Sequence, residues 1–551
     1  MCGVIGVIGQ SPVIADIVDG LLFLQHRGQD AAGAATYDGS TFRHVRAMGL
    51  VREVFDRVDL SFHTGHVGIG HVRYPTIGGG SVEDAQPFLV NSPFGIAMCH
   101  NGNLTNFKPL RKELQDKCRR HVGSQCDVEV ILNVFADELA RLTAGSSLPP
   151  DDPATIDAIF QAVTGTFRRC KGSYSVVAVI AGVGMLAFRD PFGIKPLIFG
   201  RKADGEGAKS SDAIRASEFA RAAEPVRTAA PARNGSSARS GEHARNGEHH
   251  RSGEHTRGAM PAKGTRWMVS SESCALISQG YKIERDIQPG EAILFRTGEA
   301  PLARQVTPGK PHLCIFEFIY FARPDSEIDG ISVYKARMRL GSALARRWEE
   351  ADMPDVDTVI PVPDSSRPAA QQMASKMKKP FREGLLKNRY IGRTFIMPGD
   401  ANRKKGIRYK LSPVRLEIRN KRILLVDDSI VRGNTSRAII QMVRETGARE
   451  VHMASSCPPL RFPCVYGVDM STKREFIARD RTDDEVRKAI GADSLLYQRL
   501  DDMVAACRPP NEEGERKFCM ACMDGKYPTG DITPEVLAEI EGERTTAGAG
   551  V

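Results

Sequence analysis

Residues 425–436 read LVDDSIVRGNTS, and they decide the fold of the second half of the chain. The apolar run that ends at Val426 predicts a buried strand that delivers two carboxylates, Asp427 and Asp428, where open α/β sheets bind ligands. A glycine and hydroxyls follow, and a helix is expected to begin near Thr435, so that backbone N–H groups can cradle a phosphate. Because two carboxylates would repel a phosphate, we expect the pair to face sugar hydroxyls, a cation, or both. The stretch therefore predicts a parallel α/β sheet that holds a phosphorylated sugar by its 5′-phosphate and its ribose diol.

A second strand and turn support the same sheet. Val356 to Val362 is a short β-branched run, and the polar turn after it reaches Ser366. Lys387 then opens a basic loop that extends to Arg415. Such a loop is suited to close over a pyrophosphate leaving group and exclude water, although basic loops are often simply solvated. Beside the acidic motif, we favour the interpretation as a lid.

The other end of the chain offers a nucleophile. Cys2 follows Met1 directly, and because its side chain is small we expect Met1 to be removed, which leaves a thiol and a free α-amine on one residue. A presequence would block that amine unless it were cleaved at Cys2. A lone Met-Cys would more often be a chance cysteine at a chain end, so its meaning depends on the polar groups around it.

Polar segments at expected strand ends or turns supply those groups. They are residues 24–30, 71–76, 100–104 and 126–129. Arg73 can pair bidentately with an α-carboxylate, and Asp127 can accept hydrogen bonds from an α-ammonium. Asn101 and the Gly102 N–H can form an oxyanion hole for a tetrahedral intermediate at a side-chain amide. Each of these is an ordinary turn residue when taken singly, but the ordered set behind an N-terminal cysteine predicts a site for an amino acid that carries a side-chain amide.

Composition frames these two sites. The chain has 551 residues, too many for one core, with 41% hydrophobic and 26% charged residues, as in ordinary globular proteins. No apolar run approaches the roughly 20 residues that span a bilayer, and no signal peptide is found. The net charge of +9 suits anionic small molecules, and we find no motif for DNA or RNA binding. The 12 cysteines are scattered, unlike a secreted disulfide framework, so we expect a cytoplasmic protein.

A low-complexity insertion at about 203–264 interrupts the first half. It consists mainly of Ala, Arg, Gly, Ser, Glu and His, with a basic residue at every sixth position from Lys209 to Lys263. No apolar position recurs, which argues against a β-helix, and the Gly-rich second part is expected to be disordered. We assign the insertion no catalytic role.

Taken together, the motifs resemble known families. The 425–436 run resembles the phosphoribosyl-pyrophosphate motif of type I phosphoribosyltransferases, and the set around Cys2 resembles class II glutamine amidotransferases. The combination is similar to the glutamine phosphoribosylpyrophosphate amidotransferase family over nearly the whole chain except the insertion and the end of the tail. This resemblance implies an α+β N-terminal-nucleophile hydrolase domain of four αββα layers at 2–300. An α/β type I phosphoribosyltransferase domain at 311–508 and a C-terminal tail with a cysteine pair at 509–551 would follow. The tail is expected to end in a loose Gly/Ala/Thr stretch.

The resemblance also implies roles for single residues. Cys2 would attack glutamine, Asn101 and Gly102 would hold the oxyanion, and Arg73 and Asp127 would bind the rest of the substrate. Phosphoribosyl pyrophosphate would be bound by Asp427, Asp428, Ser429, Arg432, Gly433, Thr435, Ser436 and Lys387. Mg²⁺ would be held by Ser366, Asp427 and Asp428. One departure is Cys126, where relatives usually carry Ser, and we expect no effect on the role of the adjacent Asp.

The implied activity is the first committed step of de novo purine synthesis. Glutamine and phosphoribosyl pyrophosphate would give 5-phosphoribosylamine, glutamate and pyrophosphate, with ammonia passed internally through a channel built by Tyr320 and the 387–415 loop once substrate is bound. Feedback by purine nucleotides and a homotetramer are further implications of the resemblance. The alternative is a non-catalytic regulator that senses phosphoribosyl pyrophosphate, and the intact Cys2 argues against it.

The last motif is a cysteine pair in the tail, Cys519 and Cys522. By itself a Cys-x-x-Cys fits zinc, redox chemistry or free thiols. Cys314 and Cys464 stand where one branch of the family places further ligands, and four thiolates suit either zinc or an iron–sulfur cluster. The resemblance favours a [4Fe–4S] cluster.

Overall fold

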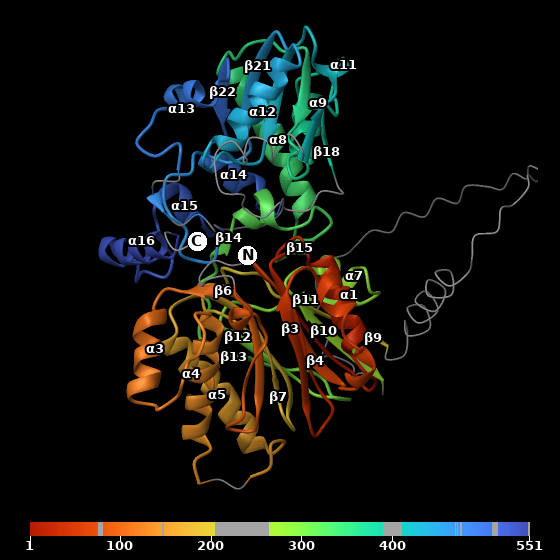
Figure 1. The fold of residues 1–551 in the computed structure, drawn as a ribbon, viewed down its shortest axis with the longest axis vertical. Helices are drawn as coiled ribbons and strands as arrows, with labels where there is room; N and C mark the ends of the chain where they lie inside the picture. Colours follow the sequence, from red (N-terminus) through yellow and green to blue (C-terminus); the bar gives the residue numbers. More distant parts are fainter. Residues whose placement is uncertain are drawn as a thin grey trace, which may run out of the picture.

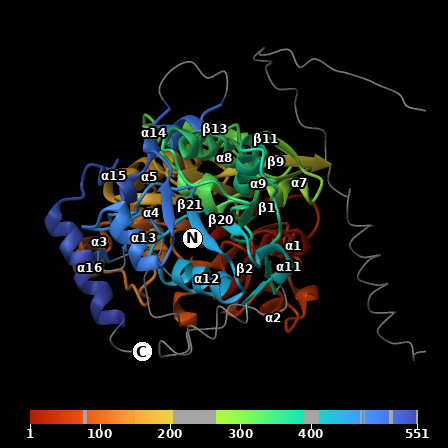
Figure 2. The ribbon, with the colours of Figure 1, turned by 90° about the horizontal axis from the view of Figure 1, so that it is seen from above.

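The computed structural model describes residues 1–74, 81–145, 148–203, 264–388, 410–468, 470, 472–473, 476–509 and 516–548 (Figure 1). The chain forms two parts that lie one above the other in this view, and its N-terminus lies at the boundary between them. Figure 2 shows the same molecule from above, with the N-terminus near the middle of the view and helices α15 and α16 along one side. No described helix is long and apolar enough to cross a membrane.

The N-terminal part contains two antiparallel sheets packed face to face. The first has the order β11-β9-β10-β1-β4-β2-β3, from β1 (Gly3–Ile8), β2 (Ala31–Tyr37), β3 (Phe42–Met48), β4 (Val67–Arg73), β9 (Ile198–Ala203), β10 (Thr265–Ser270) and β11 (Lys282–Asp286). The second has the order β13-β12-β8-β7-β6-β5, from β5 (Phe88–Val90), β6 (Ile96–Leu104), β7 (Gly172–Ile180), β8 (Gly184–Arg189), β12 (Glu291–Phe295) and β13 (Leu302–Gln305). Apolar side chains such as Val4, Ile69 and Val177 fill the space between the sheets.

Helices cover both outer faces of this sandwich. The first sheet carries α1 (Ile14–Phe23), α2 (Val51–Phe55) and α7 (Ser273–Ile277). The second carries α3 (Phe107–Asp116), α4 (Asp127–Leu142) and α5 (Pro153–Arg169). The two sheets approach so closely at Gly6 that an added Cβ would lie 2.5 Å from Met185 Sδ and from Val177 Cγ1. The four αββα layers confirm the predicted N-terminal-nucleophile fold.

The second part is a parallel sheet with the order β17-β20-β21-β22, which confirms the predicted α/β class. Its strands are β17 (Thr358–Pro361), β20 (Arg422–Asp427), β21 (Glu450–Ser455) and β22 (Ser494–Tyr497). Its helices are α8 (Val333–Glu350), α9 (Arg367–Lys376), α11 (Arg415–Ile418), α12 (Asn434–Glu445), α13 (Asp483–Ile490) and α14 (Leu500–Ala506). A small hairpin of β18 (Leu385–Lys387) and β19 (Leu411–Pro413) brackets the basic loop, of which residues 389–409 lie outside the described part.

A shared apolar core joins the two parts. Between them run β14 (Leu313–Cys314), the π-helix η3 (Glu317–Phe321), β15 (Glu327–Ile328) and β16 (Ile331–Ser332). The core combines Met1 and Ile194 of the first part with Phe318 of η3 and with residues of the second part. The Arg189 guanidinium also donates hydrogen bonds of 2.8 and 3.1 Å to the Asp329 carboxylate. The interface is therefore both apolar and charged.

The end of the first domain and the C-terminal tail differ in part from what the sequence predicted. The second sheet continues through β13, beyond the expected boundary at residue 300. The tail, of which only the Gly/Ala/Thr end was expected to be loose, forms β23 (Phe518–Cys519), α15 (Ala521–Asp524) and α16 (Pro534–Gly548). Helix α16 begins with Pro534, a residue favoured at a first helical position, and its Leu537 and Ile540 pack against the shared core. Residues 204–263 of the insertion lie outside the described part of the chain.

Candidate active sites

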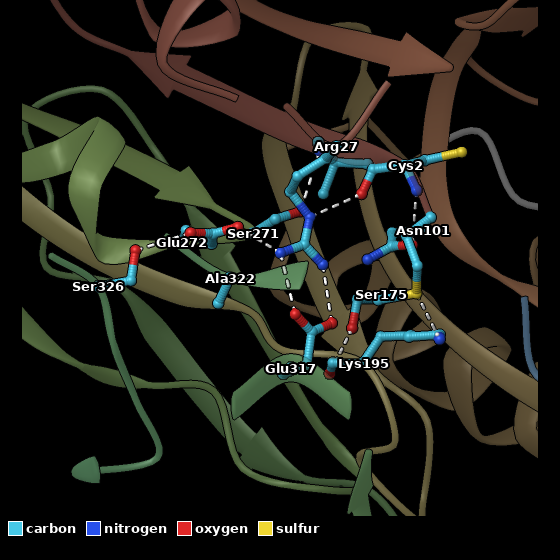
Figure 3. Close-up of polar contacts among 12 residues, drawn as sticks. Cys2, Arg27, Asn101, Ser175, Lys195, Ser271, Glu272, Glu317, Ala322 and Ser326 are labelled. Atoms are coloured by element: carbon cyan, nitrogen blue, oxygen red, sulfur yellow. Dashed lines mark hydrogen bonds and ion pairs between the residues drawn. The ribbon is translucent and has the colours of Figure 1, made fainter. Parts of the chain in front are cut away.

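Cys2 lies just before β1, at the boundary between the two parts of the molecule (Figure 3). Its backbone N–H donates a 3.2 Å hydrogen bond to Asn101 Oδ1, and its thiol lies 3.6 Å from the Tyr74 carbonyl oxygen. Met1 is still attached in this structure and is only 2% exposed. Burial, with added repulsion from Lys195 and Arg27, lowers the pKa of the Met1 α-amine to about 5. The Met1 α-amine is therefore held in its neutral form.

The predicted oxyanion residues lie on β6, beside Cys2. Asn101 reaches Cys2 because the carboxyl half of β6 lies next to the start of β1 in the facing sheet. Its Nδ2 is buried and has no hydrogen-bond partner among the described residues. Gly102 packs so tightly on β7 that an added Cβ would lie 2.0 Å from the Ser173 carbonyl oxygen. Asn101 thus presents a buried donor next to the nucleophile.

The two predicted glutamine-binding charges are each paired with an opposite charge. Arg73 ends β4, and its Nη2 lies 3.3 Å from Asp84 Oδ2. Asp127 begins α4, accepts a 2.9 Å hydrogen bond from the Leu104 N–H and lies 3.2 Å from His100 Nε2. Burial alone would raise the pKa of Asp127, but His100 and these hydrogen bonds hold it below its ordinary value. Both ionic groups are thus held in place by oppositely charged partners from this chain.

Cys126, the one departure from the expected pattern, directly precedes Asp127 and is buried with it. Its thiol accepts a 3.6 Å contact from Gln86 Nε2, and the same amide side chain accepts a hydrogen bond from the His100 N–H. Burial raises the pKa of the Cys126 thiol well above its ordinary value, so the thiol is neutral. Residues 75–80, which include part of the predicted 71–76 segment, lie outside the described part of the chain.

Asp427 and Asp428 lie at the carboxyl end of β20, as predicted. Both are buried, at 7% and 9% exposure. Ser429 Oγ donates a 2.7 Å hydrogen bond to Asp428 Oδ1, and Ser365 Oγ donates to Asp428 Oδ2. Burial raises the pKa of each carboxyl, and the charge of Asp428 raises that of Asp427 further. The turn after β17, which contains Ser365, and the turn after β20 therefore meet at the Asp427–Asp428 pair, as predicted.

The phosphate loop has the expected form. Gly433 adopts the left-handed conformation with φ 73°, and α12 begins at Asn434, one residue before the expected start. The Ser436 side chain is buried at the helix start. Ser366, predicted to contact Mg²⁺, donates its hydroxyl to the carbonyl oxygen of Val362. Lys387 ends β18, and its Nζ lies 2.9 Å from Asp364 Oδ2, at the same edge of the sheet.

The four predicted cluster cysteines meet in the shared core. The parallel pairing of β14 with β23 places Cys314 opposite Cys519, and Cys464 and Cys522 belong to the same buried cluster. Burial raises the pKa of the Cys519 and Cys522 thiols, and the neighbouring thiols raise it further. Among the described residues, no group of three or more potential ligands has the geometry that holds a metal ion. The structure thus assembles the four thiols without arranging them around a metal.

Comparison with known proteins extends these findings to the whole chain. The family described as "Glutamine amidotransferase domain" matches residues 73–215, and "Phosphoribosyl transferase domain" matches residues 335–473. The Amidophosphoribosyltransferase of Pasteurella multocida is 43% identical over 551 residues, which cover 99% of this chain and 96% of that protein. The chain belongs to the amidophosphoribosyltransferase family. The Saccharomyces cerevisiae member is 37% identical, with 99% and 95% of the two chains covered.

Solved structures of amidophosphoribosyltransferases have the same architecture. A structure titled glutamine phosphoribosylpyrophosphate amidotransferase from B. subtilis complexed with ADP and GMP is 33% identical, with a TM-score of 0.75 over 96% of this chain and 97% of that one. A second, titled as the allosteric regulatory enzyme of purine biosynthesis, gives a TM-score of 0.77 at 33% identity over 98% and 99% of the chains. The predicted family, fold and enzyme class are confirmed, and the first committed step of purine synthesis is favoured over a non-catalytic regulator.

Sequence reasoning missed the groups that hold these sites together. Asp84 and Gln86, which contact Arg73 and Cys126, are marked by no short motif. His100 belongs to the predicted 100–104 segment, but its contact with Asp127 was not predicted. Each contacts its partner from another strand or loop, so only the fold shows the pairing. The buried ion pairs of Arg27 with Glu272 and Glu317 were missed for the same reason.

Proposed function

We propose that this amidophosphoribosyltransferase releases ammonia from glutamine at Cys2 and uses it to displace pyrophosphate at the Asp427–Asp428 site. The observation that supports this division of labour most directly is the buried Asn101 side chain. Its Nδ2 donor has no partner among the described residues, while its Oδ1 accepts from the Cys2 N–H. A donor held unpaired beside a nucleophile suits the oxyanion of a tetrahedral intermediate.

The first reaction requires a free α-amine on Cys2. Once the residues before Cys2 are removed, that amine would accept the thiol proton, and the thiolate sulfur would attack the side-chain amide carbon of glutamine. The C–N bond breaks as ammonia leaves with the proton, and a water molecule later hydrolyses the thioester to glutamate. Arg73 and Asp127 would bind the α-carboxylate and the α-ammonium of glutamine, and their existing partners would keep both side chains oriented.

The second reaction is a displacement at the ribose C1 carbon. Ammonia forms the new C–N bond while the C–O bond to pyrophosphate breaks. The N–H groups at the start of α12 and the hydroxyls of Ser429, Thr435 and Ser436 would bind the 5′-phosphate, with Arg432 and Gly433 shaping the loop. Lys387 would bind the pyrophosphate, and Asp427 and Asp428 the ribose hydroxyls.

The acidic pair also fits Mg²⁺. Two buried carboxylates whose pKa values are raised by burial, that of Asp427 also by the charge of Asp428, form a hard oxygen donor set that a divalent cation would stabilise. Asp427, Asp428 and the Ser366 hydroxyl would hold the ion, which when bound supplies charge neutralisation for the pyrophosphate. The Ser366 hydroxyl would have to turn from the Val362 carbonyl to take part.

The cysteine group fits a [4Fe–4S] cluster in its donor set. Cys314, Cys464, Cys519 and Cys522 bring four buried thiols from the interdomain linker, the second domain and the tail to one place. A cluster there would tie these three segments together. Iron and sulfide analysis and the visible absorption of anaerobically purified protein separate this proposal from zinc and from free thiols.

Regulation by purine nucleotides and a homotetrameric assembly are also proposed. Support for the first is the B. subtilis relative, whose structure is titled as a complex with ADP and GMP. Inhibition assays with GMP and ADP, and sedimentation of the purified protein, test these two proposals directly.

The central test compares two nitrogen donors in the Cys2→Ala variant. Glutamine-dependent formation of 5-phosphoribosylamine is expected to disappear, whereas synthesis from ammonia is retained. Cys118→Ala, which removes a partly exposed thiol on the far side of the second sheet, serves as a matched control and should retain both activities. Loss of both activities in Cys2→Ala, or of neither, would contradict the proposal.

A further inference from the structure

A loop of the second domain packs directly against Gly102, the proposed oxyanion residue of the glutamine site. Gly467 in this loop adopts the left-handed backbone conformation with φ 93°. A Cβ added at Gly467 would lie 2.8 Å from the Gly102 carbonyl oxygen and 3.1 Å from the Gly102 carbonyl carbon. Both the conformation and the close approach require glycine at this position. The strand end that carries the oxyanion N–H therefore rests on a segment from the other half of the chain.

Two side-chain hydrogen bonds fix this loop to the strands that carry and flank Gly102. Asn103, the next residue on β6, donates a 2.9 Å hydrogen bond from Nδ2 to the Val465 carbonyl oxygen. Ser173, which is paired with Asn103 across β7, donates a 3.0 Å hydrogen bond from Oγ to the Tyr466 carbonyl oxygen. Both donors are buried, so loss of either bond would leave a carbonyl oxygen unpaired away from water. The loop is thus held against β6 and β7 in one register.

The C-terminal tail holds the same loop and the same strand end (Figure 1). The hydroxyls of Tyr466 and Thr529 share a 2.6 Å hydrogen bond, and the Thr529 N–H donates a 3.4 Å bond to the Tyr466 hydroxyl oxygen. Two residues later, Asp531 Oδ2 accepts a 2.8 Å hydrogen bond from the Thr105 hydroxyl, just beyond the end of β6. The tail therefore clasps the loop and the oxyanion strand together.

The loop also closes on itself. The Cys464 N–H donates a 2.7 Å hydrogen bond to the Met470 carbonyl oxygen, and Cys464 Sγ accepts a 3.4 Å hydrogen bond from the Tyr466 N–H. Tyr466 itself is only 1% exposed. A buried loop with these internal bonds has little freedom to move away from Gly102. Any displacement of Gly467 is therefore passed on to β6, because close-packed interiors transmit strain.

We propose that Gly467 and Tyr466 are positioning residues for glutamine hydrolysis, which hold the Gly102 N–H where it donates to the developing oxyanion. This inference rests on the proposed roles of Cys2 and Gly102. Asn101 supplies the other donor, which is already buried beside Cys2. A displaced donor loses much of its effect, because the charge that it stabilises develops only in the transition state. The glutamine site is therefore completed by the second domain and the tail, whether or not the second site is occupied.

The variant Gly467→Ala tests this positioning role. Glutamate release is measured at saturating Mg²⁺ and phosphoribosyl pyrophosphate, so that the occupation of the second site is constant. We expect kcat to fall by about 10–100-fold while KM for glutamine stays within about 2-fold, because the added methyl group displaces a donor that acts only in the transition state. Synthesis from ammonia should be unchanged, since that reaction needs no oxyanion hole. An unchanged kcat, or a rise in KM alone, overturns the proposal.

Gly447→Ala is the matched control for backbone strain. Gly447 also has a left-handed φ, of 101°, but a Cβ added there would meet Arg419, 3.3 Å from its side-chain Cγ. This variant should keep both activities. The proposal is overturned if Gly447→Ala loses as much glutamine activity as Gly467→Ala, or if Gly467→Ala loses ammonia-dependent synthesis to the same extent. If the wild type releases no glutamate, the proposed function fails; an active wild type with an unaffected Gly467→Ala refutes the positioning role alone.

A milder pair of variants guards against misfolding of Gly467→Ala. Tyr466→Phe keeps the ring but removes its hydroxyl from the bond with Thr529, and Thr529→Val removes the same bond from the other side. Each should lower kcat for glutamine by about 2–5-fold at constant KM, and the double variant should lose no more than the weaker single variant. Additive losses, or losses in KM rather than kcat, would contradict a clasp that acts on the oxyanion strand.

Discussion

The proposed glutamine site and the proposed ribose-phosphate site differ in how their charges are balanced. At the glutamine site, Arg73 is paired with Asp84 at 3.3 Å, and Asp127 with His100 at 3.2 Å. At the ribose-phosphate site two adjacent carboxylates are buried together, and their pKa values are raised. The charges of the first site are therefore already balanced within the chain, whereas the second site retains a repulsion between carboxylates that a bound cation would relieve.

The two sites also differ in the elements that carry them. Cys2, Asn101 and Arg73 stand at or next to strands of two packed sheets, which fix them through many backbone hydrogen bonds. The acidic pair stands at a strand end that leads into a loop and a helix start. A substitution at one site should therefore leave the activity of the other site intact. The following predictions test this independence, from the largest expected effect to the smallest.

The largest effect is expected from Asp427→Asn. Synthesis from either nitrogen donor should fall by at least about 100-fold, because the ribose and Mg²⁺ contacts are lost. The ligand-free protein should nevertheless become more stable, by roughly 0.5–2 kcal/mol near neutral pH, since the repulsion is removed.

The pH dependence of that gain follows from the raised pKa. A carboxyl whose folded pKa is raised stabilises the fold fully below its unfolded pKa of about 3.9, and the contribution is lost as the pH rises through the folded value. The stability gap between Asp427→Asn and the wild type should therefore widen from pH 4 to pH 8 in thermal unfolding at constant ionic strength. Asp355→Asn, at an exposed ion pair, is the control. If Asp427→Asn is less stable than the wild type, the Asp427 carboxylate does not destabilise the ligand-free fold as we infer.

A smaller and more selective effect is expected from Arg73→Lys. Lysine keeps the charge but loses the bidentate grip on the substrate carboxylate, so KM for glutamine should rise by roughly 10–100-fold. Steady-state kinetics with ammonia should be unchanged, because Arg73 lies only in the glutamine site. The matched control is Arg43→Lys, at an exposed arginine on β3 of the same sheet. An equal loss of activity with glutamine and with ammonia would mean that Arg73 also affects the second site.

Cys126→Ser should change little. A serine hydroxyl can accept a hydrogen bond from the Gln86 amide N–H as the thiol does. The thiol is neutral, so its replacement changes no charge beside Arg73 and Asp127. We expect kcat/KM for glutamine to stay within about 3-fold of the wild type. A loss of tenfold or more in the same assay would assign the thiol a role of its own.

The smallest effect is expected from replacing residues 204–263 by a short glycine-containing turn. Ala203 and Thr265 are directly opposed in the β9–β10 pair, so the chain leaves and re-enters the sheet at one place, and a short hairpin can close it. Activity with both donors should be unchanged. Loss of either activity would show that the insertion contributes to one of the sites.

The features that were predicted from the sequence are those marked by short runs of neighbouring residues. The order of strand, acidic pair, glycine and hydroxyls fixed the second fold class, and α12 begins at Asn434, within one residue of the expected start. The pairing of Cys2 with Asn101 was anticipated because each residue type suits one step of amide hydrolysis. Helix α16 was missed because its composition was interpreted from the Gly and Thr near its end rather than from its helix-forming first turns.

Long-range charge pairs were not predictable in the same way. Arg27 and Glu272 are 245 positions apart, and Arg27 and Glu317 are 290 apart. A buried arginine has the same sequence appearance as an exposed one, and nothing in the residues around Glu317 marks it as a partner. Only the fold, which docks η3 against the start of β1, reveals that these side chains meet.

The burial of Met1 has a consequence for how the enzyme matures. A peptidase needs an accessible chain end, but Met1 is packed in the core between the two halves, where Phe318 also lies. If Cys2 is the nucleophile, we expect trimming to be completed before the chain up to Phe321 has been made and has docked. At about 5–20 residues per second, that leaves roughly 15–60 s from the start of synthesis. A chain that folds first would be locked as an ammonia-dependent enzyme, so the share of glutamine-using molecules in a cell would be decided by a race during translation.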